Sequence, residues 1–267
     1  MLKSDYHVHS NYCDGADTIK DMANEAVSRG LTAIGFSTHS PLHPKYGMDY
    51  QIKDEKVDDY IADVLKVKEE LKDKITVLLG VECDYFSEID HSRFDYVIGS
   101  VHQLEVKGEF PAVDHAESIM VNNVNNLYGG DYKAYVKDYY TLLKDVKNKT
   151  HCDFVGHFDV ITKYNEGSKY FDETASWYLD LALETADVLI RQDAVFEINT
   201  GAIARGLRTS PYPSKIIYDY IVKNGGKFVL NSDCHYKRNL TYWFENIREY
   251  YKNVDAIFDY CDLVKQK

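Results

Sequence analysis

The stretch Leu2-Lys3-Ser4-Asp5-Tyr6-His7-Val8-His9 places two histidines at the end of a short run with the composition of a β-strand. Side chains two residues apart in a strand point to the same face, so His7 and His9 can both coordinate one metal ion. A pair of histidines is also common at purely structural positions. The predicted fold therefore depends on whether other strand-like runs end in the same kind of residue.

The chain alternates between short apolar runs and longer segments with helical periodicity, without an internal repeat or a flexible linker. The strand-like runs cover residues 2–6, 33–36, 75–81, 96–99, 153–155, 194–198 and 227–230. Helices are expected over residues 17–29, 53–72, 132–146 and 173–191, from Pro213 to residues 224–226, and from about Leu240 and Val254. About seven βα units predict a parallel α/β architecture, either a barrel or a doubly wound open sheet.

Ligand-type side chains at the ends of the runs decide between these two architectures. Eight of them stand at six strand ends: His7, His9, His39, Glu82, His102, His157, Asp233 and His235. The carboxyl ends of barrel strands converge on one mouth, whereas an open sheet would spread these residues along a crevice. We therefore predict a single-domain, TIM-like (β/α)7 barrel over residues 1–267.

The mixture of imidazole and carboxylate at this mouth suits zinc, manganese or iron better than calcium. Eight ligand-type residues over-supply one ion, so two or three divalent ions are expected, with Glu82 as a bridge between them. Strand alternation turns Cys83 and Cys234, each next to a proposed ligand, into the barrel wall. Cys13, in the loop beside Asp14, stays open. The remaining loop histidines are expected to be structural or surface residues: His91, His115 and His151.

Charge and composition limit the possible partners. The formal net charge of −12 disfavours nucleic acid and anionic membranes, and no stretch approaches the length of an apolar membrane span. The five cysteines form no CxxC pair, and the N-terminus shows no signal sequence, which together favour a reduced, cytoplasmic protein. A monomer is expected, since no large apolar surface stripe is visible.

Six successive motifs resemble those of the PHP (polymerase and histidinol phosphatase) family, in order and from end to end of the chain. They are Asp5-Tyr6-His7-Val8-His9, Ser37-Thr38-His39, Gly80-Val81-Glu82, Gly99-Ser100-Val101-His102, Gly156-His157 and Ser232-Asp233-Cys234-His235. The stretches over residues 78–85 and 94–102 are similar to the histidinol-phosphatase branch. The resemblance implies a distorted seven-stranded barrel with a trinuclear metal site.

The resemblance also implies three sets of ligands, carried over residue by residue. The first ion would take His7, His9, Glu82 and Asp233. The second would take Glu82, His102 and His157. The third would take His39 and His235, with Asp14 as a further ligand, although Asp14-Gly15 is equally typical of a simple turn.

The expected reaction is hydrolysis of a phosphate ester. A hydroxide bridging the first two ions would be the nucleophile, and the candidate catalytic residues are Glu82, Asp233 and His43. Arg205 is the first choice for a fork-shaped phosphate contact, and Arg208 the second, with a solvated loop arginine as its alternative. His43 would contact the phosphate or protonate the leaving oxygen, and a plain loop residue is the alternative. Glu197 is expected to orient the site.

The branch resemblance implies that the substrate is L-histidinol phosphate, cleaved to L-histidinol and phosphate in histidine biosynthesis. Another phosphoesterase of the family, acting on a nucleotide phosphate or a phosphodiester, is the alternative within the same class. From a different class, the barrel could keep its metal for structure alone. Chelation discriminates these classes, because a catalytic metal can be removed with little loss of folded signal.

Overall fold

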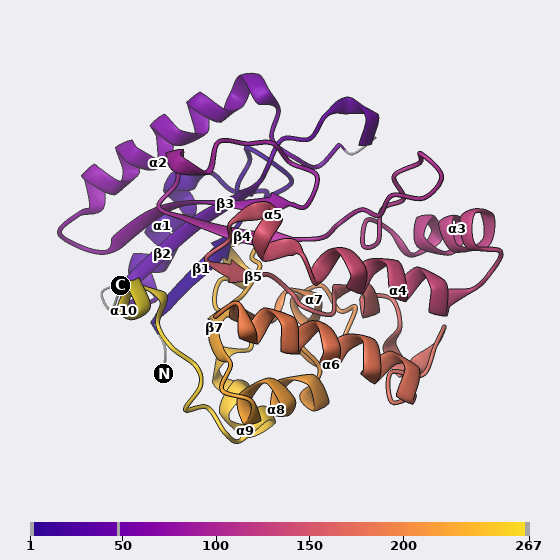
Figure 1. Ribbon diagram of the computed structural model, residues 1–267. Helices are drawn as coiled ribbons and strands as arrows, with labels where there is room; N and C mark the ends of the chain where they lie inside the picture. The colour runs from indigo at the N-terminus through magenta and orange to yellow at the C-terminus, as the bar shows by residue number, and fades with distance from the viewer. Residues whose placement is uncertain (1–2, 47–48, 265–267) are drawn as a thin grey trace.

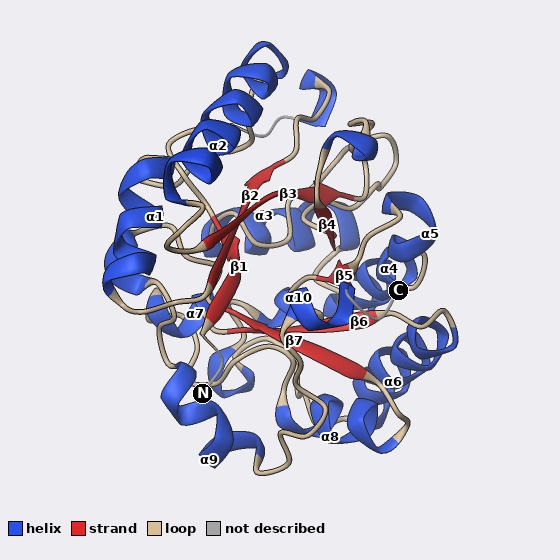
Figure 2. Cartoon of the chain, turned by 90° about the vertical axis from the view of Figure 1, so that its left-hand side faces the viewer, coloured by secondary structure: helices blue, strands red, loops and turns tan. Residues whose placement is uncertain are grey.

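The computed structural model describes residues 3–46 and 49–264, which form a parallel sheet of seven strands arranged in space in their order along the sequence. Figure 2 shows these strands as a ring surrounded by helices. A doubly wound sheet would instead reverse its strand order at a switch point. The predicted barrel is therefore confirmed. Its strands are β1 (Ser4–Val8), β2 (Ala33–His39), β3 (Thr76–Asp84), β4 (Tyr96–Ser100), β5 (Phe154–Val155), β6 (Val195–Asn199) and β7 (Lys227–Asn231).

The ring closes between β1 and β7 at its carboxyl end. Val8 pairs in parallel with Cys234, in the turn after β7, and two hydrogen bonds join the backbones: His9 N to Cys234 O at 2.9 Å, and Cys234 N to His7 O at 3.0 Å. Further down, a side chain links the strands, because Tyr6 N donates to Asn231 Oδ1 at 2.9 Å. The barrel is distorted at this seam, which brings the first motif, at His7 and His9, beside the last, at Asp233 and His235.

The centre of the barrel is filled by aromatic rings. Tyr96 lies so close to the backbones of β2 and β3 that a Cβ on Gly80 would fall 2.1 Å from its ring. Its hydroxyl donates to the carbonyl of Tyr6 at 2.5 Å. Helix α10 (Tyr260–Val264) lies across the ring of strands in Figure 2, and the ring of Tyr260 packs 5.5 Å from those of Tyr6 and Tyr96. This packing fills the barrel, so no pore runs through it.

Helices cover the outside of the barrel in two groups, with α1 and α2 beside the first strands and α4, α6 and α8 beside the last (Figure 1). None of the helices in the described residues is long and apolar enough to cross a membrane. The remaining helices are α1 (Ile19–Ser28), α2 (Val57–Leu71), α3 (Glu117–Tyr128), α4 (Tyr132–Leu143), α5 (Val146–Thr150), α6 (Ser176–Arg191), α7 (Gly201–Ala204), α8 (Lys215–Lys223) and α9 (Ile247–Tyr251).

Several connections differ from the prediction. The chain passes from β3 to β4 with only a 3₁₀ turn at His91–Arg93, so this unit lacks its α-helix. Helix α3 was missed because its sequence, ESIMVNNVNNLY, contains four asparagines, which are poor helix formers. The last two helices begin at Ile247 and Tyr260, later than predicted, and Pro213 precedes α8 rather than opening it. Leu2, predicted in the first strand, lies outside the described residues.

Candidate metal centre

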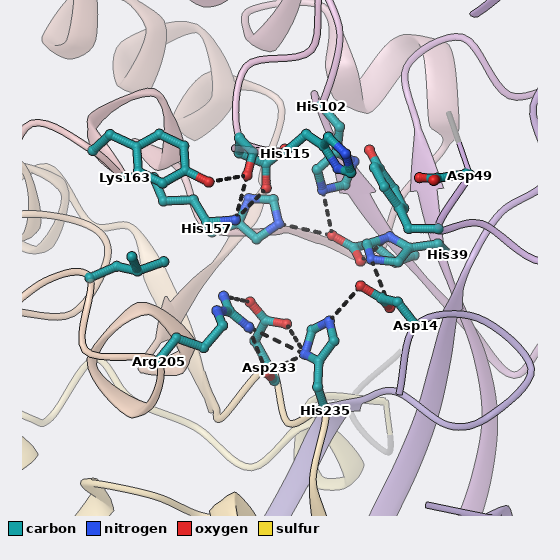
Figure 3. Close-up of a pocket in the computed structure, with 15 residues that line it drawn as sticks. Asp14, His39, Asp49, His102, His115, His157, Lys163, Arg205, Asp233 and His235 are labelled. Carbon is teal, nitrogen blue, oxygen red and sulfur yellow. Dashed lines mark hydrogen bonds and ion pairs between the residues drawn. The ribbon is translucent and has the colours of Figure 1, made fainter. Parts of the chain in front are cut away.

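The carboxyl ends of the strands surround a cavity of about 520 Å³ (Figure 3). Seven of the nine predicted metal ligands line it, and the other two, His7 and His9, are fully buried against them. Arg205, the predicted phosphate contact, and residues that were not predicted complete the lining. The residues around the cavity are Asp14, His39, Asp49, Tyr50, Glu82, His102, Asp114, His115, His157, Lys163, Tyr164, Arg205, Leu207, Asp233 and His235.

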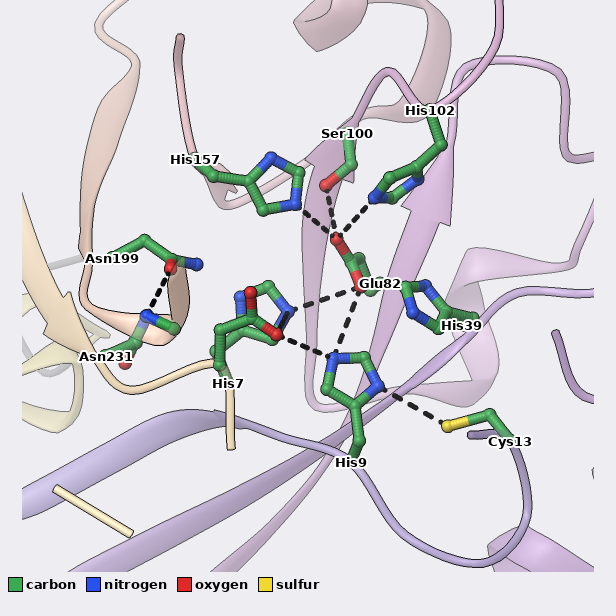
Figure 4. Close-up of polar contacts among 12 residues, drawn as sticks. His7, His9, Cys13, His39, Glu82, Ser100, His102, His157, Asn199 and Asn231 are labelled. Carbon is green, nitrogen blue, oxygen red and sulfur yellow. Dashed lines mark hydrogen bonds and ion pairs between the residues drawn. The ribbon is translucent and has the colours of Figure 1, made fainter. Parts of the chain in front are cut away.

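Glu82, near the end of β3, lies at the centre of the predicted ligands (Figure 4). Its carboxylate is fully buried, and its two oxygens contact different histidines. Oε1 lies 3.2 Å from His102 Nε2 and 2.8 Å from His157 Nε2. Oε2 lies within 3.5 Å of three further imidazole nitrogens: His7 Nε2 at 3.2 Å, His9 Nε2 at 3.5 Å and His39 Nδ1 at 2.9 Å.

Three groups of donor atoms could each hold an ion, since the atoms within each group lie within 4.8 Å of one another. They are His7, His9 and Asp233; His39, Glu82 and His102; and His9, Asp14, His39 and His235. The second group differs from the set that the resemblance implied, because His39 stands where His157 was expected. His157 nonetheless contacts Glu82 through its Nε2. Asp14, the least certain of the sequence candidates, belongs to the third group, with its Oδ2 3.2 Å from His235 Nε2.

Unpartnered buried atoms indicate that these groups fit a metal. His7 Nε2, His9 Nε2 and Glu82 Oε2 are buried without a hydrogen-bond partner. Buried polar atoms are almost always paired, so atoms left free at one point suggest a ligand there. Burial and the neighbouring His235 and His39 lower the pKa of His9 to about 3, which keeps its imidazole neutral, as a metal ligand must be. The donor set of imidazole and carboxylate suits zinc, manganese or iron.

The carboxylates of the cluster are held ionised. Burial alone would raise the pKa of Glu82, but His39, His7 and His102 outweigh it and hold the pKa well below its usual range. At Asp233, Arg205 and His7 outweigh the effect of burial and lower the pKa. At Asp14, His39 and His235 outweigh burial and lower the pKa in the same way. The cluster therefore offers negative charge to a cation throughout the neutral pH range.

Glu197 on β6 orients the imidazole of His7 and holds the backbone of His157. Its Oε1 accepts a hydrogen bond from His7 Nδ1 at 2.7 Å, and its Oε2 accepts one from the backbone nitrogen of His157, also at 2.7 Å. A proton on Nδ1 leaves Nε2 of His7 with a free lone pair towards Glu82. Such an arrangement fixes the tautomer that a metal needs.

Other residues support the cluster from outside. Asp84 accepts from the backbone nitrogen of His102 at 2.9 Å, and its Oδ2 lies 3.3 Å from His102 Nδ1. Cys13, left open by the sequence, has its Sγ 3.4 Å from His9 Nδ1. Asp233 has a left-handed backbone, with φ of 48°, so it does not continue the alternation of β7 as the spacing predicted. Asp5 stabilises this turn by accepting from Ser232 N at 3.0 Å.

The two arginine candidates lie in different surroundings. Arg205 lines the cavity, where its guanidinium donates to Asp233 Oδ2 at 3.0 Å and lies 3.2 Å from His235 Nδ1. Arg208 does not line the cavity. Both of its Nη atoms are taken by Glu173, at 2.7 and 3.0 Å, so this buried ion pair leaves no fork free for a phosphate.

His43 also lies outside the cavity. It is exposed and lines a separate hollow with Pro41, Lys45 and Arg93, where its Nδ1 accepts from Lys45 N at 3.2 Å. A general acid must reach the leaving oxygen directly or through one water. In this structure His43 is not positioned for that role.

The sequence interpretation missed the residues of the remaining cavity wall. Asp49, Tyr50, Asp114, Lys163 and Tyr164 lie several residues beyond the nearest strand end, and His115 was predicted to be a structural or surface residue. One signal was available for part of this wall. Asp114-His115 and Lys163-Tyr164 are polar pairs in the long loops that follow β4 and β5, on the carboxyl side where barrel sites form.

These features define the class of the protein: a parallel α/β barrel with histidine and carboxylate groups arranged to hold metal ions at the mouth of the strands. Residues 5–201 match the PHP domain family. The chain therefore belongs to the PHP domain family. The matched region ends before β7, so Asp233 and His235 lie beyond it.

Individual relatives span most of the chain. A protein of Deinococcus radiodurans named a probable histidinol-phosphatase is 30% identical over 240 residues, which cover 86% of this chain and 85% of the relative. The crystal structure of a candidate histidinol phosphatase from Listeria monocytogenes superposes with a TM-score of 0.81 at 18% identity, covering 91% of this chain and 99% of the other. That of a histidinol phosphate phosphatase from Lactococcus lactis, complexed with zinc, L-histidinol and phosphate, has a TM-score of 0.67 at 23% identity, covering 94% of each chain. At these identities the two structures support the fold.

Proposed function

We propose that this protein is a metal-dependent phosphomonoesterase that hydrolyses L-histidinol phosphate to L-histidinol and phosphate, a step of histidine biosynthesis. The observation that carries the proposal is the position of Glu82, whose two oxygens face five histidines at the floor of a cavity that also presents Arg205. The name of the Deinococcus relative supports the choice of substrate.

The proposed metal ligands are those that the sequence indicated, shared among two or three ions of zinc, manganese or iron. They are His7, His9, Asp14, His39, Glu82, His102, His157, Asp233 and His235. Bound divalent cations would polarise the phosphoryl group and activate water for its attack. Glu82 and Asp233 would hold these cations together, because each carboxylate contacts donors of more than one group.

The protein's own residues would bind and orient the ester. Arg205 would turn its guanidinium towards the phosphate, since it already lies at the edge of the donor groups. Lys163 lines the same cavity, where its charge is already paired with Asp114. A cavity of about 520 Å³ suits a small-molecule substrate.

The proposal extends to a monomer in the cytoplasm. No disulfide joins the cysteines of the described residues, which fits a reducing compartment. Size-exclusion chromatography with light scattering measures the oligomeric state directly, and a stable dimer would contradict the proposed monomer.

The experiment that tests the proposal is a comparison of phosphate release from a panel of esters by the metal-loaded protein. We expect the highest kcat/KM for L-histidinol phosphate. A clear preference for a nucleotide phosphate or a phosphodiester would assign the protein to another activity of the family. Chelation should abolish turnover while leaving most of the circular-dichroism signal. If chelation unfolds the protein and no ester is cleaved, the metal serves structure alone.

A further inference from the structure

Asp114 presents an unused, charged oxygen on the wall of the cavity. Its Oδ2 receives a hydrogen bond from Lys163 Nζ at 3.1 Å, whereas Oδ1 is buried without any partner. The segment is held firmly, because Lys163 Nζ also donates to the Asp114 carbonyl at 2.6 Å and the Tyr164 hydroxyl donates to the same carbonyl at 2.9 Å. Burial raises the pKa of Asp114, but Lys163 and the nearby His102 outweigh it and lower the pKa to about 2. Oδ1 is therefore a fixed acceptor with negative charge.

Tyr50 supplies a second unused atom in the same cavity. Its hydroxyl is buried without a partner, and its ring lies 4.7 Å from that of His39 and 5.9 Å from that of His115. Among the neighbouring charges, Asp114 acts most strongly on Tyr50. A carboxylate oxygen and a hydroxyl from two residues that line one cavity, each buried without a partner, suggest a ligand with several N–H donors there.

The two parts of the cavity differ in the charge they accept. Arg205, Asp233 and His235 line the part that would hold a phosphate, and Figure 3 shows them in its lower half, with Lys163, His115, His157 and His102 in its upper half. Beside the Lys163–Asp114 ion pair, the upper wall offers the unpartnered Asp114 Oδ1 and aromatic rings, and both kinds of group bind cations. In L-histidinol phosphate the ammonium nitrogen lies three bonds from the ester oxygen, so a bound ester can present its phosphate to one region and its ammonium to the other.

We infer that Asp114 Oδ1, together with the Tyr50 hydroxyl, binds the protonated amine of the leaving alcohol. Asp114 thereby makes the site selective for phosphate esters of amino alcohols. The inference rests on the proposed function and deepens it, because it assigns the choice of alcohol to residues outside the donor groups. Asp114 acts on substrate binding and leaves the chemistry at phosphorus unchanged.

The test compares Asp114→Asn with the wild-type protein on two esters. One is L-histidinol phosphate, and the other is 3-(imidazol-4-yl)propyl phosphate, which is the same ester without the amine. A hydrogen bond to a charged group predicts that Asp114→Asn lowers kcat/KM for L-histidinol phosphate about 10- to 100-fold. For the ester without the amine we expect a change of less than about threefold, since asparagine keeps the shape of the wall.

Two further variants make the test specific. Asp49→Asn removes an acid of the same cavity that is exposed and already solvated, so the ratio of the two kcat/KM values should stay as in the wild type. Tyr50→Phe removes a single hydroxyl and should lower the ratio in the same direction as Asp114→Asn, which keeps the inference testable if the Asp114 variant does not fold.

The outcomes separate the inference from the proposed function. A fall in the ratio with Asp114→Asn and Tyr50→Phe supports the inference. An equal loss for both esters, an unchanged ratio, or a fall confined to Asp49→Asn overturns it while the proposed function stands. If the wild-type protein cleaves neither ester but cleaves others of the panel, the proposed function fails, and the inference fails with it.

Discussion

Replacing Glu197 by glutamine is expected to remove His7 as a metal ligand without deleting a single ligand atom. The Glu197 carboxylate accepts four hydrogen bonds. Oε1 receives His7 Nδ1 at 2.7 Å and Asn231 Nδ2 at 2.9 Å, and Oε2 receives His157 N at 2.7 Å and Asn199 Nδ2 at 3.0 Å. Glutamine has one oxygen for these four donors, so its amide nitrogen must face two of them.

The structure indicates which two donors lose their acceptor. The backbone nitrogen of His157 cannot become an acceptor, whereas an imidazole can change its tautomer, so the glutamine oxygen should take the Oε2 position. The side-chain amide of Asn231 cannot turn over freely, because its Oδ1 accepts from Tyr6 N. His7 would then accept at Nδ1 and carry its proton on Nε2, the atom that faces Glu82 at 3.2 Å. That nitrogen would no longer have a lone pair for a metal.

The size of the effect follows from these contacts. Loss of an outer partner of a ligating histidine lowers metal affinity about 10- to 100-fold, and an inverted tautomer places Glu197→Gln at the upper end of that range. The buried Asn231 amide also loses its acceptor, so the free energy of unfolding of the metal-free protein should fall by about 1–3 kcal/mol.

The assay is a competition titration of zinc or manganese against a chromophoric chelator, starting from chelator-stripped protein. Urea denaturation of the same stripped protein measures the stability separately. Glu173→Gln is the matched control, because Glu173 accepts two bonds from Arg208 and one from Asn165 and supports no site histidine through them. This control should lose stability and keep its metal affinity. Wild-type metal affinity in Glu197→Gln would refute the tautomer argument.

Four further outcomes follow from the same geometry. Arg205→Ala should raise KM for L-histidinol phosphate about 10-fold or more with a smaller change in kcat, and an unchanged KM would remove Arg205 from the site. His43→Ala should leave kcat within about twofold in steady-state assays, because His43 lies outside the cavity, and a large loss would contradict its observed position. Burial raises the pKa of Asp159 to about 7, so ionisation costs the folded state stability as pH rises from about 4 to 7. Asp159→Asn should remove that decline, up to about 3 kcal/mol between pH 5 and 8 in urea denaturation, and parallel pH profiles would count against it. Calorimetry should detect phosphate binding to the metal-loaded protein only, and equal binding after chelation would show that the protein alone suffices.

The sequence predicted the strand-end residues well because a single rule governs them. The carboxyl ends of the strands lie together at the barrel mouth, whatever the neighbouring loops do, and polar residues there can share one site. Glu82 and His39 lie on β3 and β2 directly opposite each other in register, and their contact needs no further information. The ring closure between Val8 and Cys234 then brings Asp233 to His9, although Asp233 itself leaves the strand geometry.

Residues on loops could not be predicted in this way. The sequence distance of four residues between His39 and His43 suggested proximity, but Ser87 Oγ donates to the carbonyl of Pro41 and holds the loop towards the outer wall. Arg208 is taken out of the site by Glu173, 35 residues earlier in the chain. Asp114 and Lys163, from separate loops, meet only in the folded chain. Such long-range partners leave no periodic pattern in the sequence.

The charge of the cavity explains why an acidic protein can be expected to take a phosphate only after it has taken metal. Five carboxylates line the cavity against two basic side chains, Lys163 and Arg205, and each of these two is already paired, with Asp114 and with Asp233. Neither basic side chain is therefore free to meet a phosphate dianion, and the net charge of −12 gives the molecule as a whole no attraction for one. A divalent ion beside Asp233 would compete for its carboxylate and release the Arg205 fork at the same time. Metal binding would thus supply positive charge and make Arg205 available to contact the phosphate. Phosphate binding would therefore follow metal binding.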